Sequence, residues 1–185
     1  ADLGLDTDRP TLLVSGGSQG AVAINDAVVA ARDTLLADGV QILHVVGPKN
    51  IKGNTKIVDE TTGAAWLPVG YVDDMASAYV AADLMVARSG AGTVVETATV
   101  GLPTIYVPLP HGNGEQARNA TSAVDAGAGV VVTNAELDAQ RLLAETARIH
   151  DADALARMSA AGRGLMPAHA AEEMAARVIS ATNSK

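Results

Sequence analysis

The chain has 185 residues, which suits one well-packed domain and leaves little room for a second. Hydrophobic residues make up 48% of the sequence and charged residues 18%, a composition typical of a globular protein and not of a disordered one. The net charge of −8 argues against a nucleic-acid partner, because binding a phosphate backbone needs a basic face. The absence of cysteine excludes a disulfide framework and a thiolate metal site, and it fits a cytoplasmic protein.

Apolar runs alternate with segments of helical periodicity from one end of the chain to the other. In chain order, short apolar runs predict strands at residues 11–15, 42–46, 65–69, 83–87, 103–107 and 129–132. Helical spacing predicts helices at residues 21–37, 73–82, 92–100, 115–126, 135–150, 152–162 and 168–181. The polar segment at residues 50–63 is expected to form a surface loop or a short helix. No apolar run approaches the ~18 residues that a membrane-spanning helix needs.

Strands that alternate with helices predict βαβ units, and therefore an α/β fold with a Rossmann-like, doubly wound parallel sheet of about six strands. Residues 1–10 are expected to be a lead-in or interdomain segment, and residues 11–185 one domain. Ligands of such sheets bind beyond the carboxyl ends of the strands. The loops in which we expect site residues are therefore those at residues 15–21, 69–74, 87–93 and 107–116.

The first of these loops contains Gly16-Gly17-Ser18-Gln19-Gly20. It fits the G-x-S-x-G turn that presents the nucleophilic serine of α/β-hydrolases, and it also fits a glycine-rich turn that cradles a phosphate. The hydrolase interpretation needs an oxyanion loop from an earlier element, and nothing before this first strand could supply one. The dinucleotide pattern G-x-G-x-x-G, with an acidic residue roughly 20 positions later, is also absent. The phosphate interpretation is therefore favoured.

The third loop, Arg-Ser-Gly-Ala-Gly-Thr at residues 88–93, opens another helix. Taken alone, Thr93 and Glu96 are interpreted most simply as a capping box, and Asp73 or Asp74 is expected to cap the preceding helix. Two glycine-rich turns before helices of one sheet favour a ligand that contains a diphosphate. Glu96 then suits a sugar diol, because a carboxylate can accept two hydroxyl hydrogen bonds together.

The fourth loop combines proline, glycine and polar residues, as binding loops often do, and His111 lies within it. Glu115 and Gln116 stand where the next helix is expected to begin. Helix capping is therefore the simplest role for these two residues, and ligand binding is the alternative.

Five stretches together carry a resemblance to a known family. They are GGSQGA (16–21), YVDDM (71–75), RSGAGTVVE (88–96), GLP (101–103) and PLPHGNGEQ (108–116). In this order and with these gaps, the chain from about Pro10 to its end resembles the C-terminal half of the MurG family, bacterial glycosyltransferases of lipid-linked peptidoglycan synthesis. The resemblance implies one half of a two-domain GT-B fold. In that fold the C-terminal domain binds UDP-N-acetylglucosamine and the N-terminal domain binds the lipid acceptor, lipid I.

The resemblance also implies a set of donor-binding residues. They are Gly17, Ser18, Gln19, Val72, Ala91, Gly92, Thr93, Glu96, His111, Glu115 and Gln116. The glycine turn with its serine would lie by the diphosphate or sugar, and Val72 would meet the uracil through its backbone. The N–H groups of residues 91–93 would bind the diphosphate, and Glu96 the ribose hydroxyls. Glu115 and Gln116 match a pair that binds the sugar hydroxyls. Many members of the family have leucine in place of Gly92 and glutamine in place of Glu115.

The implied reaction is a direct inverting displacement, in which an acceptor hydroxyl attacks the anomeric carbon and UDP leaves. Helix starts and backbone N–H groups can stabilise the leaving diphosphate, so neither a metal nor another cofactor is expected. Lipid I, and any contact with the membrane, would belong to the N-terminal domain that this sequence lacks. We therefore expect this chain alone to bind the donor without turnover, and the full-length protein to be cytoplasmic, at the inner face of the cell membrane.

Other roles are compatible with the same residues. The chain could be the soluble subunit of a split UDP-sugar transferase, or a non-enzymatic nucleotide-sugar-binding module. A non-hydrolysing sugar-nucleotide epimerase shares the fold but also needs two domains. A serine hydrolase would be labelled at Ser18 by a fluorophosphonate.

Overall fold

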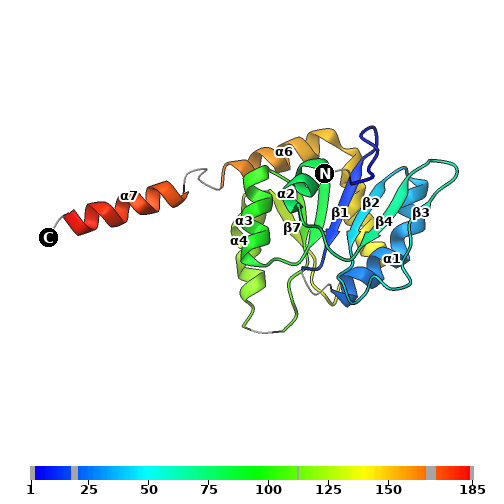
Figure 1. The fold of residues 1–185 in the computed structure, drawn as a ribbon, viewed down its shortest axis with the longest axis horizontal. Helices are drawn as coiled ribbons and strands as arrows, with labels where there is room; N and C mark the ends of the chain where they lie inside the picture. The colour runs from blue at the N-terminus through cyan, green and yellow to red at the C-terminus, as the bar shows by residue number, and fades with distance from the viewer. Residues whose placement is uncertain (1–2, 18–20, 112, 166–169, 184–185) are drawn as a thin grey trace.

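The computed structural model describes residues 3–17, 21–111, 113–165 and 170–183. These residues form a seven-stranded sheet with the strand order β3-β4-β2-β1-β5-β6-β7 (Figure 1). Every pairing within this sheet is parallel except that of β3 with β4. In chain order the strands are β1 (Thr11–Ser15), β2 (Gln41–Val45), β3 (Ile57–Val58), β4 (Ala65–Val69), β5 (Leu84–Ala87), β6 (Thr104–Tyr106) and β7 (Gly129–Val131).

Helices cover both faces of the sheet, so the expected Rossmann-like, doubly wound α/β fold is confirmed. In chain order they are α1 (Val22–Ala37), α2 (Met75–Ala81), α3 (Ala91–Val100), α4 (Glu115–Asp125), α5 (Ala139–Thr146), the 3₁₀ helix η1 (Ala147–His150), α6 (Ala152–Arg163) and α7 (Ala170–Asn183). Side chains of α1, α5 and η1 pack on one face, and those of α2, α3 and α4 on the other.

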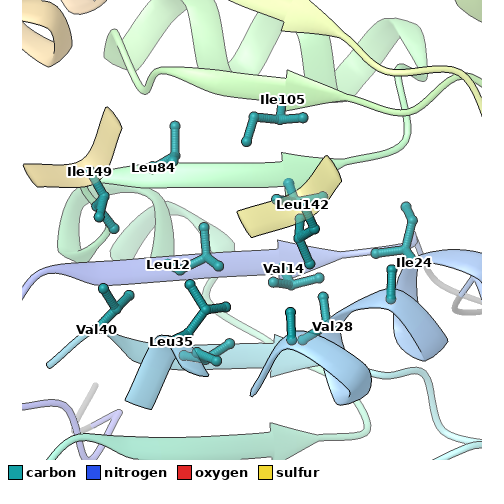
Figure 2. Packing of buried hydrophobic residues seen from close by; sticks show 14 of the residues in the cluster. Leu12, Val14, Ile24, Val28, Leu35, Val40, Leu84, Ile105, Leu142 and Ile149 are labelled. Atoms are coloured by element: carbon teal, nitrogen blue, oxygen red, sulfur yellow. The ribbon is translucent and has the colours of Figure 1, made fainter. Parts of the chain in front are cut away.

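The core is aliphatic and is divided by the sheet into two layers. Successive side chains of a strand point to opposite faces, so Leu12 and Val14 of β1 lie in the layer under α1, and Leu13 lies in the layer under α2. Figure 2 shows the first layer, where Val28 of α1 and Leu142 of α5 pack against the strands. This packing holds the strand ends, and the loops that follow them, in fixed relative positions.

Two elements differ from the sequence-based expectation. Residues 50–63 contain the short strand β3, which makes seven strands where about six were predicted. A two-residue strand at a sheet edge is too short for a periodic signal. The helix predicted at 135–150 begins at Ala139, because Glu136 accepts hydrogen bonds from the N–H (3.1 Å) and hydroxyl (2.8 Å) of Thr133 and closes a turn there. The last part of that helix is the separate 3₁₀ turn η1.

Helix α7 stands apart from the rest of the molecule in Figure 1. All of its side chains from Glu172 to Thr182 are exposed, including Met174, Val178 and Ile179. Within the described residues, no helix is both long enough and apolar enough to cross a membrane.

Candidate functional site

A hollow of about 200 Å³ lies at the carboxyl ends of β1 and β2. Its lining residues are Ser15, Gly17, Val45, Tyr71, Val72, Met75, Tyr79 and Thr93. Three of these, Gly17, Val72 and Thr93, were predicted as site residues from three separate loops. These loops follow β4, β1 and β5, and they meet because these strands are parallel and end at the same edge of the sheet.

The start of α3 reaches this hollow through Thr93. Gly90 is the N-cap residue, with an extended backbone (φ −61°, ψ 149°), and its carbonyl accepts a hydrogen bond from the N–H of Val94 at 3.0 Å. The N–H groups of residues 91–93 come before that bond and have no acceptor within the helix, as at any helix start. Together with the helix dipole, they form a place where an anion is stabilised.

The capping-box interpretation of Thr93 and Glu96 is wrong. That motif requires Thr93 to be the N-cap residue, but Gly90 occupies the N-cap and Thr93 is already the third residue of the helix. The carboxylate of Glu96 is instead bound across the groove between α2 and α3. Its Oε2 atom accepts a hydrogen bond of 2.7 Å from the hydroxyl of Tyr79.

Tyr79 was not recognised in the sequence as a site residue. Its side chain is almost fully buried, and burial, followed by its hydrogen bond to the Glu96 carboxylate, raises the pKa of the phenol. It borders both the 200 Å³ hollow and a neighbouring apolar groove of about 350 Å³ between α2 and α3, which Glu96 and Met75 also line. A tyrosine at a helical core position gives no sequence signal for this contact.

Asp74 is the N-cap of α2, which confirms one of the two predicted alternatives, Asp73 or Asp74. Its carboxylate accepts hydrogen bonds from the N–H of Ser77 at 3.0 Å and from the Ser77 hydroxyl at 2.6 Å, and these bonds lower the pKa of Asp74. This cap fixes the chain just after the buried Val72, so the backbone of Val72 is held at the rim of the hollow.

Arg88 is a second residue that the sequence analysis missed, although it lies within a quoted motif. Its guanidinium donates to the carbonyls of Val107 (3.1 Å) and Pro108 (3.0 Å) and to the side-chain oxygen of Asn134 (2.9 Å). Arg88 therefore ties the loop after β5 to the loops after β6 and β7. Its role is to hold this edge of the sheet together.

The predicted residues at the start of α4 lie outside the two hollows described above. His111 and Glu115 are exposed, and the Gln116 side-chain oxygen accepts a hydrogen bond from the N–H of Leu109 at 3.0 Å. Neither Glu115 nor Gln116 is the N-cap of α4, because Gly114 holds that position in a left-handed conformation (φ 67°). Their capping interpretation is therefore wrong.

Ser18 and Gln19, predicted for the phosphate-binding turn, lie outside the described residues. The described part of that turn is held by a hydrogen bond from the Gly17 N–H to the hydroxyl of Ser15, at 3.3 Å. Gly17 has a φ of +85°, a conformation that side chains disfavour, which gives a backbone reason for glycine at this position.

His44 of β2 belongs to a hydrogen-bonded network on the face of the sheet that α1 covers. Its Nδ1 accepts a hydrogen bond from the indole N–H of Trp66 at 3.2 Å, and its Nε2 lies 3.1 Å from the side-chain oxygen of Asn25. Burial lowers the pKa of His44 to about 4, so the ring is neutral near pH 7. Among the residues that the structure describes, no cluster of three or more His, Cys, Asp or Glu side chains could hold a metal.

A further hollow of about 310 Å³ lies at the opposite edge of the sheet. Asp83 and Pro103, which precede β5 and β6, are among its lining residues. In open α/β sheets, ligands bind at the carboxyl ends of the strands, so we assign the functional site to the edge that holds Val72, Thr93 and Glu96.

Comparison with known proteins agrees with this fold. A model of the glycosyltransferase family 28 C-terminal domain matches residues 11–177. The chain belongs to this family. The resemblance expected from the sequence motifs is therefore confirmed at the level of the family.

The chain is similar to two curated proteins that share one name. The chain is 88% identical over 184 residues to the UDP-N-acetylglucosamine–N-acetylmuramyl-(pentapeptide) pyrophosphoryl-undecaprenol N-acetylglucosamine transferase of Cutibacterium acnes, covering 100% of the chain and 50% of the relative. It is 49% identical over 179 residues to the protein of the same name from Corynebacterium efficiens, covering 96% and 48%. Its fold matches the crystal structure of Acinetobacter baumannii MurG with a TM-score of 0.79 and 25% identity, covering 94% of this chain and 50% of that one. The chain spans about half the length of the curated relatives it matches.

Proposed function

We propose that this chain is the donor-binding half of an inverting glycosyltransferase that transfers N-acetylglucosamine from UDP-N-acetylglucosamine to a lipid-linked muramoyl-pentapeptide. Family membership and the names of the relatives support the donor and the acceptor. The observation that carries the proposal is the Glu96 carboxylate, held by Tyr79 within one and a half turns of the open start of α3. This pairs an acceptor for a sugar diol with donors for a diphosphate.

The donor lies along this edge of the sheet. The backbone of Val72 contacts the uracil at the 200 Å³ hollow, and Glu96 accepts hydrogen bonds from the ribose hydroxyls. The N–H groups of Ala91, Gly92 and Thr93 bind the diphosphate at the start of α3. The sugar then extends toward the loop that carries His111, Glu115 and Gln116, while the turn with Gly17, Ser18 and Gln19 lies by the diphosphate or sugar.

In the reaction, the acceptor hydroxyl oxygen forms a bond to the anomeric carbon as the bond from that carbon to the β-phosphate oxygen breaks. UDP leaves with the bonding electron pair, and the acceptor proton passes to a base. The start of α3 stabilises the negative charge that develops on the diphosphate in the transition state. The described residues supply the binding of the leaving group, and we assign the base to another part of the full-length protein.

We assign the acceptor and the base to the second half of a full-length protein like the relatives, which are about twice as long as this chain. Lipid I and the inner face of the cell membrane meet that half. The isolated chain therefore binds UDP-N-acetylglucosamine without transferring its sugar. Robust transfer by the isolated chain would contradict this part of the proposal.

The test is calorimetric titration of this chain with UDP-N-acetylglucosamine, UDP-glucose and NADH, without metal and then with magnesium. We expect metal-independent binding that favours the N-acetyl sugar. Glu96→Ala removes a charged hydrogen-bond acceptor and should weaken binding about tenfold or more, which corresponds to roughly 1.5–3 kcal/mol.

Glu60→Ala is the matched control for this titration, because Glu60 is an exposed glutamate in the turn between β3 and β4. This control should bind the donor as the unaltered chain does. No uridine-dependent heat from the unaltered chain at millimolar ligand would count against the proposal.

A further inference from the structure

Tyr79 connects the two helices that border the candidate site. It lies on α2 and is 7% exposed, whereas Glu96 lies on α3, 17 residues later, and is exposed. The phenol hydroxyl donates to Oε2 of Glu96 at 2.7 Å, a short bond to a charged acceptor. The hollow at the strand ends and the groove between α2 and α3 both have Tyr79 in their walls.

We propose that Tyr79 is a positioning residue for recognition of the ribose. Its hydroxyl holds one carboxylate oxygen of Glu96, so that the other oxygen is presented to the hydroxyls of the nucleotide. This inference rests on the proposed function, since it concerns how the residue assigned to the ribose is oriented.

The second carboxylate oxygen points toward the start of α3. The position that a Cβ atom would take at Gly92 is 3.8 Å from Oε1 of Glu96, so this oxygen lies one helical turn back, beside the residues assigned to the diphosphate. Ribose and diphosphate are neighbouring groups of one nucleotide. The orientation of Glu96 therefore matches the covalent order of the ligand.

An exposed glutamate on a helix ordinarily samples several rotamers, and binding a ligand must then fix one of them. Tyr79 removes much of that freedom before the ligand arrives, because its own ring is fixed by burial in the layer with Leu13, Leu43 and Met85. Orienting a ligand-binding group in advance raises affinity by lowering the entropy lost on binding. A phenol is protonated at neutral pH even at its ordinary pKa of about 10, and burial raises the pKa of Tyr79 further, so its hydroxyl is a donor.

The test compares UDP with 2′-deoxyuridine 5′-diphosphate, which lacks one hydroxyl of the diol, in titrations of this chain. Tyr79→Phe keeps the ring and removes only the hydroxyl. We expect the variant to bind UDP about three- to tenfold more weakly, and the deoxy nucleotide with affinity changed less than about twofold. Its preference for the ribonucleotide should therefore shrink.

Tyr106→Phe is the matched control. Tyr106 is also buried, and its hydroxyl is paired with the Thr97 hydroxyl at 2.8 Å, so it too contacts α3 through a phenol. Tyr106 lines neither the hollow nor the groove. The control should change affinity for neither nucleotide, and adding Tyr79→Phe to Glu96→Ala should weaken UDP binding no further.

Three outcomes would overturn the inference. Unchanged UDP affinity in Tyr79→Phe would mean that Glu96 needs no orienting partner. An equal loss for both nucleotides would mean a general structural role. An additive loss in the double variant would mean that Tyr79 acts independently of Glu96. Failure of the proposed function would be seen differently, as an unaltered chain that does not bind UDP or does not prefer it to the deoxy nucleotide.

Discussion

Two hydrogen-bonded networks lie on opposite faces of the same sheet and differ in how completely they are paired. In the first network, Trp66 donates a hydrogen bond to His44, and the other ring nitrogen of His44 pairs with Asn25. The Asn25 amide then donates to the carbonyl of Val46 at 3.0 Å. This closed network lies under α1, where His44 has no exposed surface and Asn25 is half-buried. The network of Tyr79 and Glu96 uses one carboxylate oxygen and leaves Glu96 exposed at the edge of the sheet.

The difference indicates what each network is for. In the closed network every ring nitrogen of His44 has a partner inside the protein, so its contribution is to stability and to the position of β2 relative to β4. The open network retains acceptor capacity that the described residues do not use. Changes in the closed network should therefore affect unfolding and not nucleotide binding, whereas loss of the Tyr79 hydroxyl or of the Glu96 carboxylate should weaken nucleotide binding.

The largest expected effect comes from breaking the closed network. His44→Leu leaves the buried indole N–H of Trp66 and the half-buried side-chain oxygen of Asn25 without their partner. The loss should lower the free energy of unfolding by about 3 kcal/mol, measured by urea denaturation. At a temperature where the variant is folded, its affinity for UDP should match that of the unaltered chain.

His150→Leu is the control for this substitution. His150 is exposed at the end of η1, with Nε2 3.7 Å from a carboxylate oxygen of Asp38. Its loss should change the free energy of unfolding by less than about 0.5 kcal/mol. A cost at His44 no larger than that at His150 would refute the role assigned to the closed network.

Acid should weaken the closed network over a defined range of pH. In the folded protein burial lowers the pKa of His44 to about 4, whereas the unfolded chain protonates this histidine near its ordinary value of 6.5. Between these values the unfolded state binds more protons, so the stabilisation present above pH 6.5 is lost as the pH falls. The free energy of unfolding should drop by about 3 kcal/mol from pH 6.5 to 4.

Urea denaturation at several pH values checks this, with His44→Leu as the comparison. The variant should lack most of the dependence in this window. The carboxyl groups of Asp6, Asp59 and Asp74, whose pKa values are lowered by hydrogen bonds, lose their stabilising effect below pH 4 and so do not produce the same slope. An equal slope in the variant would show that His44 is not the group responsible.

Features that depend on local sequence could be predicted well. The strands expected at residues 11–15 and 65–69 have the predicted bounds, because a buried strand between two turn signals has a clear pattern. Asp74 could be predicted as a cap because capping depends on local sequence alone. The family followed from five motifs in a specific order.

Contacts between residues far apart in the sequence could be predicted less well, and both networks depend on such contacts. Tyr79 meets Glu96 between two helices, and Arg88 reaches loops after two later strands. No periodicity encodes such pairs. The Thr-x-x-Glu pattern at Thr93 was misleading because it gives the spacing of a capping box without saying where the helix begins, and Gly90 begins it three residues earlier.

A substitution with a smaller expected effect tests whether the start of α2 contributes to the geometry of the site as well as to stability. Asp74→Ala removes the cap of α2, the helix that carries Tyr79, and should lower the free energy of unfolding by about 1 kcal/mol. Because the chain around Val72 is then less well held, the affinity for UDP should also fall, by about twofold or more. Chemical denaturation and calorimetric titration measure the two quantities.

Asp151→Ala provides a matched cap elsewhere. Asp151 caps α6 by accepting a hydrogen bond of 2.8 Å from the N–H of Ala154. Its loss should lower the free energy of unfolding by a similar amount and leave UDP affinity unchanged. If both variants lose affinity equally, the start of α2 has no special role in the site.

The smallest expected effect is a gain in stability at the open edge. Gly92 lies in the first turn of α3 with a negative φ, and a Cβ there would meet Oε1 of Glu96 at an ordinary contact distance of 3.8 Å. Gly92→Ala should therefore raise the free energy of unfolding by about 0.5 kcal/mol, since alanine restricts the unfolded chain and favours helix. UDP affinity should be unchanged, because the backbone N–H group is retained.

Gly101→Ala, at the other end of α3, is the contrasting substitution. Gly101 has a φ of +72° and a Cβ there would lie 2.6 Å from Nε of Arg163, so that variant should be destabilised by more than about 1 kcal/mol. Weaker UDP binding by Gly92→Ala would mean instead that the ligand approaches the Cα atom of Gly92 closely, and that ligand binding requires glycine at this position.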